Sequence, residues 1–515
     1  MSSTLAEASG PADGTFDPPL RDAVLAGRYF GGRFAGKAAR VAEFVVDKPG
    51  PALCRWFGPV AASRLLQDPD SMRGLLDRDI AAIDALMSEQ VDAILHAPRV
   101  RRLEGSWRGL AWLVSGLEPG GRVKVRVLTV SWAEICRDLE RASEFDQSNL
   151  FRHIYEHEFG MPGGEPFGVL LADHEVRHRR TREAPTDDVA AIAALSSIAA
   201  AAFAVVVLPA SPALLDVDEF ADLAMASDPA SPLRQPLHER WRNLAGRDDM
   251  RFVCFVLPRV LARPPWTDDP ARADGFRYAE YAPAVAQRVW MSSAYAFAAV
   301  VARAFADHAW PADIRGIDTD REGGGVVTDL PLEDFQTDPP GVWVRPPLDL
   351  VLHDGQERML VEAGLIPLTA LPYSVDAAFV SVGTMQRPKD FGPAGEAAAR
   401  NARLSSQING MLCASRFAHY IKVIVRDMVG TLETPAKIEQ RLQAWLNGYV
   451  NSAVSAGPET RARQPLAAGR VTISERADRP GTYGCTIHLQ PHFQLDEVGA
   501  TFRLITEVVS PERRG

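Results

Sequence analysis

The side chains of this sequence that could do metal chemistry are two pairs of histidines. His153 and His157 are four residues apart in LFRHIYEHEFG, so one face of a helix could present both imidazoles to a metal ion. The HExxH order of zinc proteases is missing and no third ligand can be identified, so we predict no metal site there. His174 and His178 flank the expected end of a strand, where opposite-face geometry disfavours joint ligation.

The motifs of nucleophilic and phosphate chemistry are also incomplete. A nucleophile elbow needs G-x-S-x-G, but EGSWRG at Glu104–Gly109 places its serine one position early. The glycines of Gly323–Gly325 lack the lysine of a phosphate loop, and GMPGGEPFG does not have the spacing of a dinucleotide fingerprint. We therefore predict no catalytic residue, no cofactor and no enzymatic activity. One alternative stays open, a soluble cytosolic α/β enzyme whose active site lies in distant loops and forms no motif.

The composition narrows the class of partner and the compartment. A chain of 515 residues is too long for one compact core, so we expect two or three domains. A net charge of −10 and the absence of a basic block predict no nucleic-acid partner. The five cysteines are far apart and form no CxxC, which is typical of free thiols in a reducing compartment. The polar N-terminus does not resemble a signal peptide, so we predict a cytoplasmic protein.

One uncharged stretch is long enough to cross a membrane. Val189–Leu215 carries no charged side chain, but its character changes midway. Ala190–Ala204 is rich in alanine and favours a helix, whereas Val205–Leu208 is a β-branched run that favours a strand. We therefore predict a buried helix followed by a buried strand, and no membrane insertion.

The chain divides by composition and pattern into four segments. Residues 1–18 are rich in Gly, Pro, Ser and Asp and should be disordered. Residues 19–100 should be helical, residues 101–400 should form an α/β core, and residues 401–515 should form a C-terminal domain with terminal strands. The clearest helix is Asp77–Pro98, whose apolar residues recur at helical spacing and must pack within the chain or on a partner.

Strand patterns alternate with helical ones through the middle of the chain. Val123–Ser131 alternates apolar and polar residues, and Phe167–Val176 and Phe252–Pro258 are further strand candidates. This order predicts an α/β fold, mixed with α+β features, in which helices flank a central mixed sheet. Near the end, RVTISER and TYGCTIHLQPHF should pair antiparallel through DRPG, and Phe502–Val508 should add a last strand.

Five longer stretches of the sequence, taken together, resemble a known family more specifically than any single motif does. They are EGSWRGL (Glu104–Leu110), EFDQSNLFRHIYEHEFGMPGGEPFGVLLAD (Glu144–Asp173), NARLSSQ (Asn401–Gln407), SRFAHYIKVIVRD (Ser415–Asp427) and LQPHFQLDEV (Leu489–Val498). Together and in this order they resemble the TssC/VipB family, the large subunit of the type VI secretion contractile sheath. The resemblance runs from about Asp77 to the C-terminus. The sequence departs from it at His174 and Gln464, where the family suggests tyrosine.

The resemblance implies a structural, non-enzymatic role. In that family the large subunit pairs with a small sheath subunit (TssB/VipA-like), and the heterodimers stack as a helical filament around a tube of Hcp-like rings on a baseplate. Contraction of the sheath drives the tube and its effectors into a target cell, and an AAA+ unfoldase (ClpV-like) recycles the sheath. Neighbouring protomers exchange strands, and the C-terminal strands of this sequence are the candidate interlocking region. An ordinary intramolecular sheet is the alternative reading of those strands.

The same strings supply candidate interface residues. Trp107 and Arg108 offer an aromatic anchor and a multidentate donor, both typical of interface centres. Residues of the expected helix after Asn401 fall broadly on one face and suggest a polar contact surface, with a solvated amphipathic helix as the alternative. The predicted interface set is Trp107, Arg108, Arg416, His419, Tyr420, Arg426, His492 and Phe493.

The segment LRDAVL is a short amphipathic piece near the N-terminus. It stands where some members of the family present a peptide to the recycling unfoldase, so Leu20, Val24 and Leu25 are its candidate contact residues. Because the sequence departs from the family pattern in places, a second alternative also stays open. The chain could be a regulatory paralogue that binds the small subunit and caps the lattice instead of building it.

Overall fold

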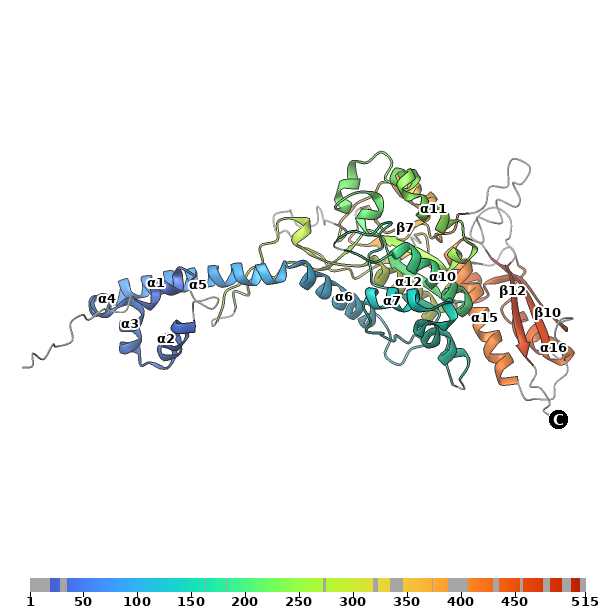
Figure 1. The fold of residues 1–515 in the computed structure, drawn as a ribbon, viewed down its shortest axis with the longest axis horizontal. Coiled ribbons are helices and arrows are strands. Elements are labelled where there is room, and N and C mark those ends of the chain that lie inside the picture. Colours follow the sequence, from blue (N-terminus) through green and yellow to red (C-terminus); the bar gives the residue numbers. More distant parts are fainter. Residues whose placement is uncertain are drawn as a thin grey trace, which may run out of the picture. The chain divides into compact units, whose positions relative to one another are not determined.

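The computed structural model describes most of the chain in two compact units (Figure 1). The described residues are 19–27, 35–161, 163–182, 184–271, 275–317, 323–333, 346–372, 374–387, 406–428, 435–453, 457–475, 482–492 and 502–509. The expected disorder of residues 1–18 therefore lies outside the described residues. One unit comprises residues 1–100 and 265–283, and the other comprises residues 101–264 and 284–515. The four segment boundaries drawn from the sequence stay predictions.

The first unit is helical, as expected from its sequence. Its helices are α1 (Leu20–Leu25), α2 (Ala35–Val46), α3 (Pro49–Phe57), α4 (Pro59–Leu65) and α5 (Pro69–Leu95). Three of them begin with proline, which fits the first helical turn because its missing N–H would have no partner there. The Asp68 side chain caps α5 by accepting from the Ser71 amide. A small apolar core forms around Leu20, Trp56 and Phe57.

The apolar stripe predicted on Asp77–Pro98 is only partly covered. Ile83 packs against the small core of the first unit. Ile80 and Ile94, by contrast, are more than half exposed. The stripe thus has an internal partner at Ile83 and leaves apolar surface open at Ile80 and Ile94.

A four-stranded parallel sheet forms the centre of the second unit. Its strands are β1 (Val169–Leu171), β2 (Val205–Pro209), β3 (Val253–Leu257) and β7 (Leu365–Pro367), in the order β1-β2-β3-β7. The register pairs Val169 with Val205, Val206 with Val253, and Phe255 with Leu365. Every residue of β2 and β3 is buried, which explains why both strands are continuous apolar runs and not alternating ones.

The uncharged stretch near residue 200 folds as its sequence predicts. Its alanine-rich part is α10 (Asp188–Ala202), which ends at Phe203 in the left-handed conformation and leads directly into β2. Helix α10 and α12 (Ser293–His308) both pack against the central sheet (Figure 1). Among the residues described, no helix is long and apolar enough to cross a membrane.

The remaining elements of this part complete a mixed α/β fold. Its other α-helices are α6 (Pro98–Ser115), α7 (Trp132–Arg141), α8 (Asn149–Phe151), α9 (His157–Phe159), α11 (Glu239–Ala245) and α13 (Asp354–Glu362). A π-helical segment, η3 (Arg152–Glu156), joins α8 to α9. The smaller antiparallel sheets contain β4 (Val260–Arg263) with β5 (Val289–Met291), and β6 (Val326–Val327), β9 (Ala377–Ala378) and β8 (Thr369–Ala370). The predicted mixed α/β class is confirmed, with the central sheet itself parallel throughout.

The C-terminal part combines three helices with a three-stranded antiparallel sheet. The helices are α15 (Ile408–Met428), α16 (Pro435–Asn447) and α17 (Pro458–Arg463), and the strands are β10 (Leu466–Glu475), β11 (Thr482–Pro491) and β12 (Phe502–Val509). The strand order is β10-β11-β12. The predicted pair joined by DRPG and the predicted last strand are therefore confirmed.

One strand prediction is wrong for this chain. Val123–Ser131 has the alternating pattern of a strand, but within the described residues it pairs with no other strand. A strand needs a neighbour for its backbone hydrogen bonds, and none is supplied there.

Candidate assembly surfaces

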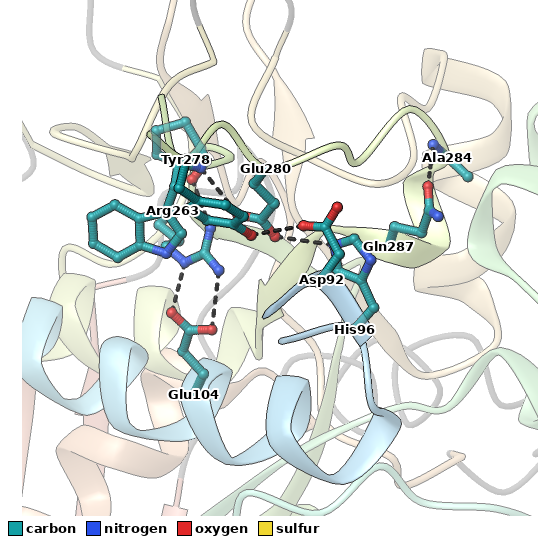
Figure 2. Close-up of polar contacts among 10 residues, drawn as sticks. Asp92, His96, Glu104, Arg263, Tyr278, Glu280, Ala284 and Gln287 are labelled. Atoms are coloured by element: carbon teal, nitrogen blue, oxygen red, sulfur yellow. Dashed lines mark hydrogen bonds and ion pairs between the residues drawn. The ribbon is translucent and has the colours of Figure 1, made fainter. Parts of the chain in front are cut away.

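Helix α6 is fixed to the second unit by a largely buried ion pair. Arg263 on β4 donates from Nε to Glu104 Oε1 at 2.6 Å and from Nη2 to Oε2 at 3.2 Å, as Figure 2 shows. Arg108, one turn along α6, donates to the same carboxylate at 2.7 Å. Burial raises the pKa of Glu104, but the bonds from Arg263 and Arg108 outweigh it and leave the pKa below its ordinary value. Glu104 is therefore held as an ion.

Two glycines set how closely α6 approaches its neighbours. A Cβ on Gly105 would lie 2.1 Å from the carbonyl oxygen of Trp290 on β5, and a Cβ on Gly109 would lie 2.4 Å from the Tyr295 ring on α12. Because four residues make about one helical turn, both glycines lie on the same face. The GSWRG string thus acts as a packing motif, and its serine does not have the position that a nucleophile elbow requires.

The opposite face of α6 leaves apolar side chains in solvent. Leu103, Trp107 and Val114 are spaced by four and seven residues and so share a face. They are 60, 56 and 47% exposed. An exposed stripe of this kind, backed by a rigid anchor, is typical of a protein–protein contact.

A second apolar surface follows in the segment that was expected to form a strand. We call Val125, Val127, Leu128 and Val130 the apolar ribbon, and these residues are 42, 55, 58 and 39% exposed. An ordinary surface strand turns its apolar side chains toward the core, whereas all four apolar side chains here are exposed. The ribbon has the sequence of a strand without the sheet that such a sequence requires.

Two basic residues of the same segment hold the ribbon to the chain. Lys124 Nζ contacts Glu165 at 2.5 Å, and Arg126 Nη1 contacts Glu158 at 2.5 Å. Glu158 also accepts from the Glu165 amide at 2.8 Å. A Cβ on Gly164 would lie 2.3 Å from the Glu158 carbonyl oxygen, so the GMPGGEP turn can close on this carboxylate only with glycine there. These ion pairs thus join the segment to Glu158 and Glu165 of its own chain.

The two edges of the C-terminal sheet differ. At the β10 edge, Gln443 of α16 accepts from the Val471 amide at 2.8 Å, and Glu439 accepts from the Ile473 amide at 2.8 Å. Side chains of a helix therefore occupy backbone groups that another strand would need. At the other edge, β12 pairs with β11 and, among the described strands, has no second neighbour.

Comparison with known proteins matches most of the chain to one family. Residues 77–386 match the model of the EvpB/VC_A0108 tail sheath N-terminal domain, and residues 397–508 match its tail sheath gpW/gp25-like domain. The chain is 32% identical over 436 residues to the type VI secretion system sheath protein TssC1 of Pseudomonas aeruginosa, covering 84% of this chain and 85% of that protein. The chain belongs to the type VI sheath large-subunit family. It is a structural sheath subunit, as the resemblance implied.

A solved structure gives a much weaker match to the sheath subunit. It is described as the anti-feeding prophage baseplate, determined by cryo-electron microscopy. The TM-score is 0.36 at 9% identity, over 73% of this chain and 81% of that one. A likeness at this level carries no argument about fold or assembly.

Of the three described interface residues predicted on α15, His419 is buried, whereas Arg416 and Tyr420 are half-buried. His419 is 1% exposed, and its Nε2 lies 2.9 Å from the Ala202 carbonyl oxygen. Arg416 stacks on the Tyr420 ring at 4.3 Å and donates to its hydroxyl. Tyr420 in turn packs edge-on against Trp310. All three residues thus make contacts within the chain, and the contact role predicted for Arg416 and Tyr420 stays a prediction.

The remaining predicted interface residues have mixed positions. Trp107 lies on the exposed stripe of α6, and Arg108 beside it binds Glu104. The His492 amide donates to the Pro465 carbonyl at 2.8 Å, next to the end of β11. The side chain of Arg426 and all of Phe493 lie outside the described residues.

The candidate unfoldase peptide coincides with α1, whose side chains are largely covered. Leu20 is fully buried, and Val24 and Leu25 are half-buried. Arg21, between them, forms an ion pair with Asp79 of α5. At the far end of α5, Asp92 accepts from the Tyr278 hydroxyl at 2.7 Å, and His96 lies 3.2 Å from Glu280 (Figure 2). Residues 265–283 thus belong to the same unit as α5.

The histidine pairs from the sequence do not form joint ligand sets. His153 and His157 contact each other edge-on, at 5.2 Å between ring centroids, and both are exposed. His174 lies 3.1 Å from Asp188 and stacks on Trp132, whereas His178 lies beside His238. The apolar ribbon is the surface that sequence reasoning missed. Its Val-Lys-Val-Arg-Val alternation was the available signal, but the same alternation is typical of an internal strand.

Proposed function

We propose that this sheath subunit pairs with a small sheath subunit through its apolar ribbon, and that the heterodimers build a contractile helical sheath. The observation that carries the proposal is the ribbon itself. Its backbone has no strand partner among the described residues, and its apolar side chains are exposed. An extended segment from a partner would supply the missing backbone hydrogen bonds and cover the valines at once.

The open edge of β12 is the proposed link between heterodimers. Strand addition at one edge only makes a head-to-tail contact, and such a contact continues into a filament when its rotation does not close a ring. Main-chain hydrogen bonds also tolerate a change of side-chain surroundings, so the link can persist while rigid bodies rotate. The edge of β10 is a poor alternative because Gln443 and Glu439 occupy its amides.

Further partners follow from the family and belong to the same proposal. The sheath would assemble in the cytoplasm on a baseplate, around an inner tube of Hcp-like rings, and contract to drive that tube outward. A recycling AAA+ unfoldase of the ClpV type would then capture α1. Because Leu20 is buried against Trp56 and Phe57, capture requires α1 to leave its site.

Co-expression with a small sheath subunit of the same secretion system tests the proposal. We expect long tubules in electron micrographs of the wild-type pair. The double variant V127D/L128D places two charges on the ribbon and should abolish co-purification of the small subunit. The matched control is M225D, because Met225 is 94% exposed but lies on a different part of the surface. This variant should form tubules as the wild type does.

The outcomes separate the proposal from its alternatives. Retention of the small subunit by V127D/L128D at wild-type levels would contradict a role for the ribbon. Monodisperse wild-type heterodimers that form no filament under any condition would contradict sheath building. If the wild-type pair instead shortens preformed tubules of another large subunit, the chain caps the lattice.

A further inference from the structure

A compact cluster of two histidines and one aspartate lies beyond the carboxyl ends of β1 and β2. His178 follows the bridge between Val176 and Ala210, which continues that part of the sheet. Asp216 ends the short helix after β2, and His238 ends another short turn. The carboxyl edge of a parallel sheet is where α/β proteins most often bind ligands. The cluster is distinct from the assembly surfaces described above.

The three side chains converge closely. The ring centroids of His178 and His238 are 3.8 Å apart, and His178 Nε2 lies 3.9 Å from Asp216 Oδ1. One potential ligand atom from each residue lies within 4.8 Å of the other two. Within the described part of the chain, this is the one such group of three His, Cys, Asp or Glu residues that could hold a metal ion.

The protonation of His238 leaves a lone pair pointing into the cluster. Its Nε2 lies 3.0 Å from the Leu214 carbonyl oxygen, which only accepts, so Nε2 carries the proton and donates. In a neutral imidazole Nδ1 is then bare, and here it is buried without a hydrogen-bond partner. A backbone carbonyl that fixes the tautomer in this way is the usual support of a metal-binding histidine.

His178 carries the second unsatisfied group. The residue is 5% exposed, and neither ring nitrogen has a hydrogen-bond partner. The neutral imidazole is the form in which histidine binds a metal ion. Buried polar atoms without a partner are costly, so the cluster calls for a group that accepts their lone pairs.

We propose that His178, Asp216 and His238 bind a divalent transition-metal ion of the Zn²⁺ type. Two imidazole nitrogens and one carboxylate oxygen are the ligands that Zn²⁺ prefers, whereas Ca²⁺ and Mg²⁺ favour all-oxygen sites. Asp216 is the exposed member, so water can complete the coordination on its side. The ion would tie together three loops that are 38 and 22 residues apart in sequence (178, 216 and 238) at one edge of the sheath core.

Metal titration of the full-length chain, purified alone or with the small subunit, tests this site. After dialysis against a chelator, Co²⁺ serves as a visible probe and Zn²⁺ as its competitor. We expect one Co²⁺ per chain, with visible absorption bands that Zn²⁺ abolishes. The variants H238A and H178Q should lose the bands. D216N changes an exposed residue and should fold normally, with affinity reduced by about tenfold or more.

The chain offers a matched control in its other histidine pair. The double variant H153Q/H157Q removes two exposed imidazoles four residues apart and should bind Co²⁺ as the wild type does. Equal binding by the wild type and D216N, or no binding by the wild type at all, would overturn the proposal. Loss of binding in H153Q/H157Q alone would assign the metal to that pair and overturn it equally.

Discussion

Arg21 and Asp79 form a bidentate ion pair inside the N-terminal helical unit. The guanidinium Nε and Nη2 donate to the two carboxylate oxygens at 2.7 and 2.6 Å, and the Trp56 indole donates to the same carboxylate at 2.9 Å. Burial raises the pKa of Asp79, but the bonds from Arg21 and Trp56 outweigh it, so the net pKa is lowered. This pair joins the six-residue helix α1 to the long helix α5, and helix α1 is too short to be stable without such contacts.

Removal of the arginine should loosen α1. R21A leaves the Asp79 carboxylate buried with two hydrogen bonds fewer, and we expect a loss of about 2–3 kcal/mol in the free energy of unfolding of this unit. Hydrogen exchange of the α1 amides should accelerate accordingly. The control is R73A, which breaks the fully exposed pair of Arg73 with Asp70 and should change stability by less than about 0.5 kcal/mol. Equal exchange in the two variants would contradict the anchoring role of Arg21.

Undocking of α1 should also govern recycling, if α1 is the peptide that the unfoldase captures. D79N preserves the shape of the side chain but removes its charge, which weakens the bond to Arg21. We expect more of this variant than of the wild type to be retained by the immobilised N-terminal domain of the unfoldase. The combination L20D/D79N should not be retained, because a charge replaces the apolar contact. Retention of D79N at the wild-type level would show that the release of α1 does not control capture by the unfoldase.

His419 predicts a pH dependence of stability. Burial lowers its pKa from 6.5 to about 4, against a smaller opposing effect of the Ala202 carbonyl. Between these values the unfolded chain binds a proton that the folded chain does not, so stability falls as pH falls. Between pH 6.5 and pH 5 the effect of His419 should lower the free energy of unfolding by about 2 kcal/mol. H419Q can still donate to the carbonyl, and its free energy of unfolding, measured with denaturant, should fall by that much less over the same pH range. The control H157Q, at an exposed position, should keep the wild-type slope.

The glycines of α6 should resist even the smallest substitution. G105A and G109A each favour the helix intrinsically, yet the new methyl meets the Trp290 carbonyl or the Tyr295 ring. Overpacking of this kind costs about 1–3 kcal/mol or more. G74A on α5 is the matched control, because a Cβ there meets nothing within 4 Å. It should stabilise the protein by about 0.5–1 kcal/mol. A stabilised G105A in thermal unfolding would refute the close approach of α6 to β5.

Local patterns predicted most elements but not their neighbours. The switch from an alanine-rich helix to the β2 strand, the bounds of α1 and the C-terminal strands could all be predicted, because each depends on residues close in sequence. The strand predicted at Val123–Ser131 was wrong because an alternating pattern shows only that a strand is possible. It does not show that a second strand lies beside it. His419 was placed on a contact surface because helical spacing defines a face but not what covers it, and the structure buries this residue.

By itself, the sequence determined the family and the mixed α/β class, since these depend on the order and type of residues along the chain. Only the tertiary structure decided which faces are buried. It turned GSWRG into a packing motif, placed His419 in the core, left the apolar ribbon exposed, and brought His178, Asp216 and His238 together. The physical reason is that burial and ligation depend on segments distant in sequence, and no local period records which of them meet.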